Sequence, residues 1–166
     1  TRTHMVLLVH IDGQHYTVDT GYGGLQPPGA LRLEANTLQE TTHETYRFLY
    51  EAPSYALQAL VGEEWRSLYT FDLQWQGDID FKVGNWYTST HPDSSFKRDI
   101  KMAIVTANGR YTLQDNRFTT YVDGETPIVE YLKTVDEIKE VLQNQFKLNL
   151  VNLPGLDKKL QQILDK

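Results

Sequence analysis

The chain of 166 residues contains no cysteine. This absence excludes a disulfide framework, a cysteine-ligated zinc or iron–sulfur site and a cysteine nucleophile within these residues. No apolar run approaches the roughly 18 residues that a membrane span needs, so we predict no membrane-spanning segment. Positive charge is also scarce, because 16 Lys and Arg stand against 22 Asp and Glu and leave a net charge of −6. This balance argues against a nucleic-acid partner.

What the sequence has instead is a series of short β-rich segments separated by strong turn signals. Asp12-Gly13, Asn108-Gly109 and Asp123-Gly124 each lie between two such segments, as two-residue hairpin turns do. The predicted strands are 5–11, 15–19, 44–50, 55–61, 65–71, 101–106, 110–115, 117–122 and 125–132. Short strands at this spacing predict a barrel or a sandwich, followed by a second β block.

Helical signals are confined to two regions. A short helix is predicted over 78–86, and helical periodicity returns after Thr134, where Glu137 completes a capping box. A final amphipathic helix is predicted after Pro154-Gly155.

The first hairpin brings His4 and Asp19 together. If Asp12-Gly13 is a two-residue turn, His4 and Asp19 become diagonal neighbours on one face of the ribbon, about 7–8 Å apart between backbones. A change of one residue in the turn would separate them onto opposite faces. The other face is apolar and is expected to pack on a core; it carries Leu7, Val9, Tyr16 and Val18.

A carboxylate beside a histidine fixes the imidazole tautomer and leaves the second ring nitrogen able to take a proton from a nucleophile. The Gly/Pro-rich stretch 21–29 follows at once and would let a substrate approach the backbone. Two other interpretations stay open on the residues alone. Asp19 could simply end a strand before a turn, or His10, His15 and Asp19 could form a metal site on the same face.

Four motifs, in order along the chain, closely resemble the arylamine N-acetyltransferase family. TRTHMVLLVHIDGQHYTVDTGYGG resembles the segment that carries the family's catalytic His and Asp, which match His4 and Asp19. The other three are WRSLYTFDL, GNWYTSTHPDSSF and GRYTLQDNRFTTYVDGE with its following helix. Together they extend over nearly the whole chain.

The resemblance implies an α+β fold in three parts. These are an antiparallel β-barrel-like domain over 1–75, a linking helix and connection over 76–96, and an α/β lid with C-terminal helices over 97–166. It also implies a Cys-His-Asp triad and ping-pong transfer of acetyl from acetyl-CoA to an arylamine, hydrazine or arylhydroxylamine. The family's cysteine lies upstream, in an N-terminal helical domain.

The resemblance implies roles for individual residues. His4 would be the base and Asp19 would orient it, while Tyr22 and Gly23 would bind the acceptor substrate. Tyr87 and Ser95 match positions that contact coenzyme A in some members. The chain departs from the family at Asp93, where a carboxylate would repel phosphate.

Several further expectations accompany this interpretation. We expect the chain to be part of a longer cytoplasmic protein of xenobiotic metabolism that includes the missing N-terminal domain. We expect no metal ligands and no nucleic-acid partner. The present chain is expected to self-associate through exposed apolar surface. The parent is expected to be an enzyme, and the chain alone to be inactive. Two alternatives are a fragment of a transglutaminase-like Cys-His-Asp enzyme and a non-catalytic β-barrel that binds a small ligand.

Overall fold

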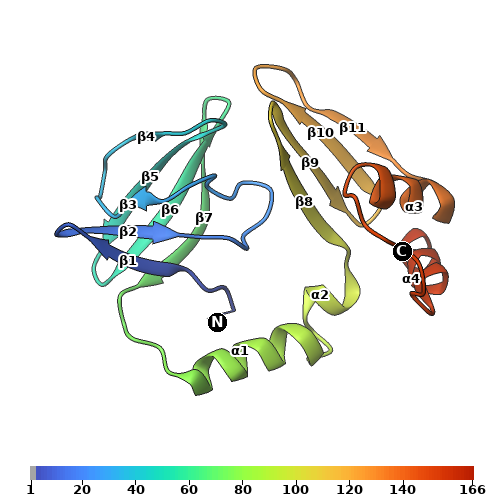
Figure 1. The fold of residues 1–166 in the computed structure, drawn as a ribbon, viewed down its shortest axis with the longest axis horizontal. Coiled ribbons are helices and arrows are strands. Elements are labelled where there is room, and N and C mark those ends of the chain that lie inside the picture. The colour runs from blue at the N-terminus through green and yellow to red at the C-terminus, as the bar shows by residue number, and fades with distance from the viewer. Residues whose placement is uncertain (1–2) are drawn as a thin grey trace. The chain divides into compact units, whose positions relative to one another are not determined.

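The computed structural model describes residues 3–166, and the chain divides into two compact units, 1–87 and 88–166. The strands of the first unit are β1 (Leu7–Ile11), β2 (Gln14–Val18), β3 (Leu31–Arg32), β4 (Gln39–Glu40), β5 (Thr45–Glu51), β6 (Ser54–Val61) and β7 (Glu64–Asp72) (Figure 1). The boundary between the units falls within helix α1 (Asp78–Thr90). The three-part division into 1–75, 76–96 and 97–166 stays a prediction.

The strands of the first unit form open antiparallel sheets. One sheet has the order β1-β2-β3 and the other has the order β4-β5-β6-β7. Among the described residues neither sheet closes on itself, so the expected barrel is not confirmed, while the α+β class with antiparallel sheets is. Closure would require a hydrogen-bonded strand at every edge, and β1 and β7 each pair on one side only.

The first hairpin has the predicted register. Asp12 and Gly13 have φ of 49° and 79°, the left-handed pair that a type I′ turn requires, and Leu7 faces Val18. The expected packing of the ribbon is wrong, however. Leu7 is 50% exposed, whereas Thr17 and Asp19 on the opposite face are 4% and 6% exposed.

The first unit's core explains this inversion. Alternate residues of β5 and β6 supply its largest buried side chains, and Leu31 joins them from β3 beside Thr17. The buried members are Leu31, Tyr46, Phe48, Leu57 and Ala59. Because Leu31 pairs directly with Thr17, the polar face of the hairpin is the one that faces the core.

Helix α1 is longer than the sequence predicted. It begins where the Gly77 N–H donates to the Asp80 carboxylate at 2.9 Å and ends at Thr90, two residues before Pro92. The prediction stopped at residue 86 because hydroxyl-rich segments have weak helix propensity. None of the helices within residues 3–166 is long and apolar enough to cross a membrane.

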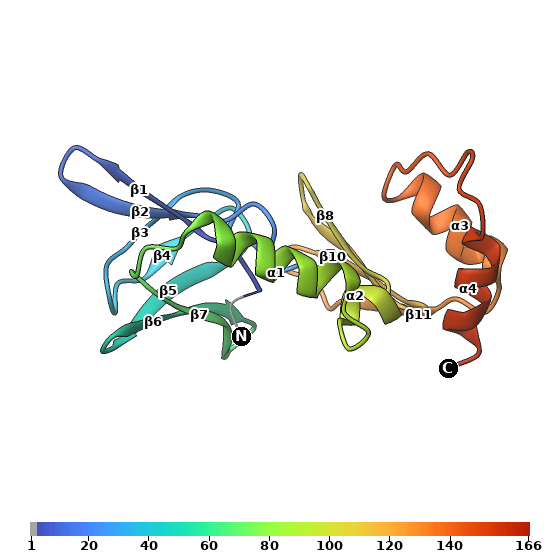
Figure 2. The same cartoon turned by 90° about the horizontal axis from the view of Figure 1, so that it is seen from below.

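The second unit packs helices against a sheet. Its elements are α2 (Ser95–Arg98), β8 (Lys101–Thr106), β9 (Gly109–Gln114), β10 (Arg117–Val122), β11 (Ile128–Tyr131), α3 (Val135–Asn144) and α4 (Leu156–Leu164). Figures 1 and 2 show α3 and α4 beside the sheet, whose order is β11-β10-β9-β8. Leu113 and Phe118 of the sheet pack with Ile138, Leu142 and Leu160 of the helices.

The predicted capping box at the start of α3 forms with one difference. The Thr134 hydroxyl accepts from the Glu137 N–H at 3.1 Å, as expected. The Glu137 carboxylate accepts from the N–H of Lys133, one residue before the predicted partner, at 2.5 Å. The helix end is still satisfied by both side chains.

Gly109 is the position where the second unit requires glycine. Its φ is +145°, and a Cβ built there would lie 2.1 Å from the Tyr121 carbonyl oxygen on the neighbouring strand. Gly109→Ala is therefore expected to lower the free energy of unfolding by about 2–4 kcal/mol, as strained backbone and overpacking add. Urea unfolding of the purified chain measures this loss.

Gly124, in the turn that follows β10, provides the control. Its φ is +79°, but no atom lies within 4 Å of the position that a Cβ would occupy. Gly124→Ala should therefore lower the free energy of unfolding by only about 1–2 kcal/mol, the cost of the strained backbone alone. Equal losses for the two variants would show that the contact with Tyr121 is unimportant.

Candidate active site

The hairpin places a histidine against a buried carboxylate. Asp19 follows the last residue of β2, and His4 precedes β1 by three residues. His4 Nε2 lies 2.7 Å from Asp19 Oδ2, and their side chains are 30% and 2% exposed, respectively. The predicted proximity is therefore observed, and the imidazole remains partly open to solvent.

Asp19 is held on both oxygens. Oδ2 contacts His4, and Oδ1 accepts the Gly21 backbone N–H at 3.0 Å. The second contact depends on the turn that begins the Gly-rich loop, so the loop sequence orients the carboxylate. A carboxylate fixed in this way can hold one imidazole tautomer and leave Nδ1 able to accept a proton.

Two tyrosines surround the imidazole. The His4 ring centroid lies 5.6 Å from that of Tyr22 and 5.1 Å from that of Tyr69, and the two tyrosine rings are 5.2 Å apart. Tyr69, on β7, was not singled out by sequence reasoning. Tyr69 lies in the motif WRSLYTFDL, which predicted a strand but not which of its side chains face the dyad.

Both tyrosines have raised pKa values. Burial is the main cause for Tyr69, and interaction with the Asp19 carboxylate raises its pKa further. For Tyr22, burial again comes first and the charge of Asp19 second. The two phenols therefore stay neutral around the dyad at physiological pH.

The Gly-rich loop keeps Tyr22 in place. Its hydroxyl donates to the Leu68 carbonyl at 2.8 Å, and the residue remains 36% exposed. Gly23 follows with φ of +105°, a conformation that a side chain would strain, and no atom lies within 4 Å of its absent Cβ. The acceptor-binding role expected for Tyr22 and Gly23 stays a prediction.

The two residues expected to contact coenzyme A lie on helices. Tyr87 is on α1 and Ser95 is the first residue of α2; both are half-buried. The connection between these helices is anchored by Ser94, whose hydroxyl donates to the Thr88 carbonyl at 2.7 Å. The cofactor-binding roles of Tyr87 and Ser95 also stay predictions.

The metal site considered as a rival does not form. The His10 and His15 ring centroids lie 4.7 Å apart, as their opposed positions predict, but Asp19 is engaged by His4. No group of three or more His, Asp or Glu side chains converges in a ligand arrangement within residues 3–166.

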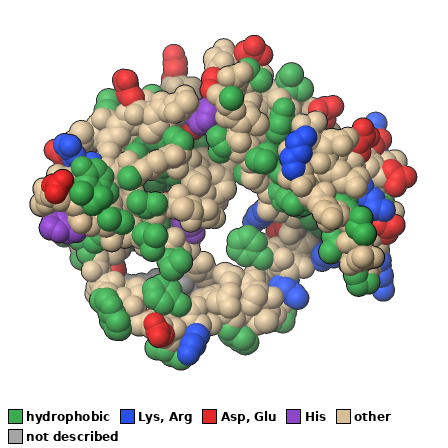
Figure 3. Space-filling view, viewed as in Figure 1, with side chains coloured by type: hydrophobic (Ala, Val, Ile, Leu, Met, Phe, Trp, Pro, Cys, Tyr) green, Lys and Arg blue, Asp and Glu red, His purple; other side chains and the backbone are tan. Residues whose placement is uncertain are grey.

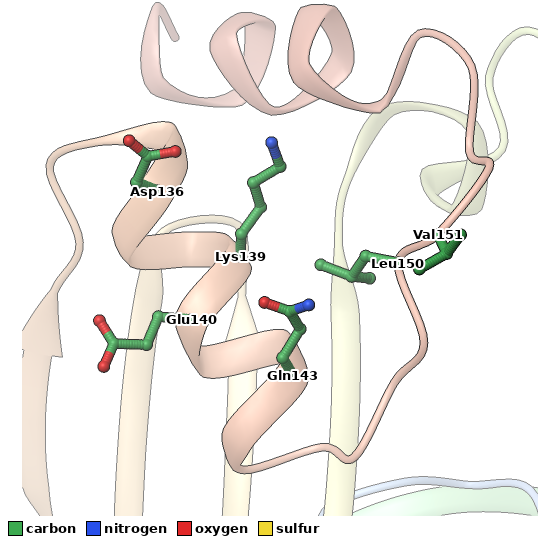
Figure 4. Close-up of a pocket in the computed structure, with 6 residues that line it drawn as sticks. All are labelled: Asp136, Lys139, Glu140, Gln143, Leu150 and Val151. Atoms are coloured by element: carbon green, nitrogen blue, oxygen red, sulfur yellow. The ribbon is translucent and has the colours of Figure 1, made fainter.

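A polar cavity lies elsewhere, in the second unit. It measures about 390 Å³ and is lined by Asp136, Lys139, Glu140, Gln143, Leu150 and Val151 (Figure 4). Lys139 is paired with Asp157 at 2.6 Å. None of the predicted site residues lines this cavity, so we assign it no chemistry.

Because the pKa of Tyr69 is raised, the free energy of unfolding depends on pH in the alkaline range. Its folded-state pKa lies above the 10.0 of an unfolded tyrosine, so the folded state binds this proton more tightly. The resulting stability is full below about pH 10 and is lost as the pH rises above it. We expect the free energy of unfolding, measured in urea, to fall less steeply above pH 10 for Tyr69→Phe than for the parent chain.

Tyr50 supplies the control, because it is 51% exposed on β5. Tyr50→Phe should keep the late-ionising component that Tyr69→Phe removes from an absorbance titration. Identical titration curves for the two variants would contradict the assignment.

Comparison with known proteins agrees with these residues. The sequence pattern of an N-acetyltransferase family matches residues 1–153. The arylamine N-acetyltransferase of Mycolicibacterium smegmatis is 35% identical over 168 residues, covering 99% of this chain and 61% of its own. A Salmonella typhimurium protein named arylamine N-acetyltransferase / N-hydroxyarylamine O-acetyltransferase is 33% identical, with 90% and 53% coverage.

A solved structure agrees as well. The Mycobacterium marinum arylamine N-acetyltransferase in complex with CoA superposes with a TM-score of 0.91 at 31% identity, covering 99% of this chain and 61% of that one. The chain thus spans little more than half the length of the relatives it matches. With its fold and its sequence both matched from end to end, the chain belongs to the arylamine N-acetyltransferase family.

Proposed function

We propose that this chain supplies the base and the positioning carboxylate of an arylamine N-acetyltransferase whose nucleophilic cysteine lies outside residues 1–166. The observation that carries the proposal is the 2.7 Å contact between His4 and Asp19 in a chain that has no thiol. His4 Nδ1 has no partner among the described residues, so this nitrogen is the one available to a thiol.

The chemistry follows from that geometry. His4 takes the proton of the cysteine thiol, and the thiolate attacks the carbonyl carbon of acetyl-CoA. The bond to the coenzyme A sulfur breaks, and the imidazolium returns the proton to that sulfur. The acceptor nitrogen then attacks the acetyl-enzyme, His4 removes its proton, and the cysteine leaves with that proton restored. The two half-reactions give ping-pong kinetics.

Coenzyme A binding is supported by the distribution of charge. Residues 88–166 contain as many Lys and Arg as Asp and Glu, so the net charge of −6 belongs entirely to residues 1–87. Ser95 is followed closely by Lys97 and Arg98, whose positive charges offset the carboxylate of Asp93. The second unit therefore presents no net repulsion to the phosphates of acetyl-CoA, in line with the CoA complex of the M. marinum relative.

The acceptor is an arylamine, a hydrazine or an arylhydroxylamine. Tyr22 offers an exposed ring beside His4, and Gly23 leaves space at the backbone, which suits a flat aromatic substrate. The name of the S. typhimurium relative covers both amine and hydroxylamine acceptors.

The missing part of the enzyme is a helical domain of the same protein, which acts in the cytoplasm. Apolar side chains near the dyad remain exposed here, among them Met5 at 59% and Leu8 at 45%. Burying them against such a domain would bring a cysteine to the side of His4 that Asp19 does not occupy.

The first test uses the chain as it is. Incubated with acetyl-CoA and an arylamine, the 166-residue chain should release coenzyme A no faster than a blank, since it has no thiol to acetylate. A thiol-reactive chromophore follows that release. Acetylated arylamine formed in proportion to the amount of this chain would refute the role given to an external cysteine.

The second test uses the longer parent protein. His4→Ala should slow iodoacetamide alkylation of its cysteine at neutral pH and lower kcat/KM by roughly 10²–10⁴-fold, because the base is lost. His10→Ala changes an exposed histidine of the same hairpin and should leave both rates unchanged. Unchanged alkylation and turnover in His4→Ala would favour a non-catalytic role for the dyad.

A further inference from the structure

Helix α2 is too short to hold itself in place. It is four residues long; Ser95 is half-buried, and Phe96, Lys97 and Arg98 are exposed. A single turn of helix is unstable by itself, so the position of α2 depends on contacts from outside it. The position matters because α2 begins at Ser95, to which the proposed function assigns a contact with coenzyme A.

The start of α2 is fixed by Ser94. This residue is 3% exposed, and its hydroxyl donates to the Thr88 carbonyl in the last turns of α1 at 2.7 Å. The Ser94 carbonyl accepts the Lys97 N–H at 3.0 Å. One buried residue therefore ties the first turn of α2 to the helix that precedes it.

The end of α2 is held by two lysines that lie far along the chain. Lys159, on α4, donates to the Lys97 carbonyl at 3.0 Å, 62 positions away. Lys166, two residues after α4, donates to the Arg98 carbonyl at 3.1 Å, 68 positions away. The last carbonyls of a helix have no partner within the helix, and a cation at this end also interacts favourably with the helix dipole. The two lysines thus satisfy consecutive carbonyls of α2.

Lys166 also connects the end of α2 to the sheet. Its ammonium nitrogen lies 3.0 Å from Asp99 Oδ1 and 3.0 Å from Asp115 Oδ2, and its hydrogen bond lowers the pKa of Asp99. Asp115 Oδ1 accepts the N–H of Ile100, which packs against the core of the second unit. An isolated surface ion pair contributes little, but here one ammonium group joins three acceptors in a network.

We propose, building on the function proposed above, that Lys159 and Lys166 are positioning residues for the coenzyme A site, because they hold α2 where Ser95 can contact the cofactor. An ammonium group has three N–H donors, and all three of Lys166 are engaged by Arg98, Asp99 and Asp115. This favours positioning over direct binding of phosphate. Figure 3 shows further lysine and arginine side chains at the surface of the second unit.

Hydrogen–deuterium exchange of the 166-residue chain, without coenzyme A, tests the first step. Lys159→Met and Lys166→Met keep the apolar stem and remove the donors. Each should speed exchange of the Lys97 and Asp99 amides about two- to tenfold, because a lost hydrogen bond makes local opening of α2 easier by that factor. Unchanged exchange at both amides in the double variant would overturn the proposal.

Two controls show whether the effect is specific. Lys158 is exposed on the same helix and makes no hydrogen bond or ion pair within residues 3–166, so Lys158→Met removes the same charge and should leave the exchange of α2 unchanged. The Ile138 amide, bonded to the Thr134 carbonyl in α3, should exchange at the parent rate in every variant. Equal acceleration at Ile138 and in α2 would show a general loss of stability and overturn the positioning role.

Kinetics of the longer parent protein test the second step. The Lys159→Met/Lys166→Met double variant should raise KM for acetyl-CoA about three- to tenfold, while kcat at saturating acetyl-CoA stays near that of the parent. Replacing both lysines by arginine keeps N–H donors and should return KM toward the parent value.

The two measurements together separate the possible failures. A raised KM with unchanged exchange of the α2 amides would mean that the lysines bind the cofactor directly, and would overturn the positioning role. Faster exchange with an unchanged KM would overturn the link between α2 and coenzyme A. Neither result would bear on the role of His4, which the alkylation experiment tests separately.

Discussion

The two-residue turn at Asp12 and Gly13 is the constraint on which the candidate active site depends. Its left-handed backbone sets the register of β1 against β2, and that register puts His4 and Asp19 on the same face. One more residue in the turn would send Asp19 to the other face and leave His4 without its carboxylate. The Gly-rich loop that begins at Gly21 then fixes the orientation of Asp19 by holding its second oxygen.

The same register explains why the hairpin's apolar face is turned outward. The face that carries Asp19 must lie against Tyr69 and the core of the first unit for the carboxylate to be buried. A ribbon has only two faces, so the other one is covered less, with Leu7 50% exposed and Val18 half-buried. The buried carboxylate of Asp19 and the exposed side chain of Leu7 therefore lie on opposite faces of the same strands. Exposed apolar side chains of this kind are typical of a surface that further polypeptide covers.

Local features could be predicted from the sequence, and long-range features could not. The Asp12-Gly13 turn, the hairpin register and the capped start of α3 depend on residues within a few positions of each other, and each is present. The other two predicted turns form differently, because Gly109 already pairs with Thr106 in the ladder and residues 123–127 join β10 to β11. Tyr69 was missed because it lies 50 positions after Asp19 and joins it only through the packing of β7. The inward face of the hairpin was misjudged because alternation shows two faces but does not tell which one the same chain covers. The prediction of a barrel was not confirmed, because whether a sheet closes depends on the pairing of strands that are far apart in the sequence.

The division of charge between the units adds a consequence for solution behaviour. Since the acidic excess resides in residues 1–87, the unit that carries the dyad has a net negative charge, while residues 88–166 have none on balance. This potential is spread over many side chains and reaches about 8–10 Å at physiological ionic strength, so no single substitution abolishes it. The first unit as a whole therefore repels small anions such as acetate and attracts small cations.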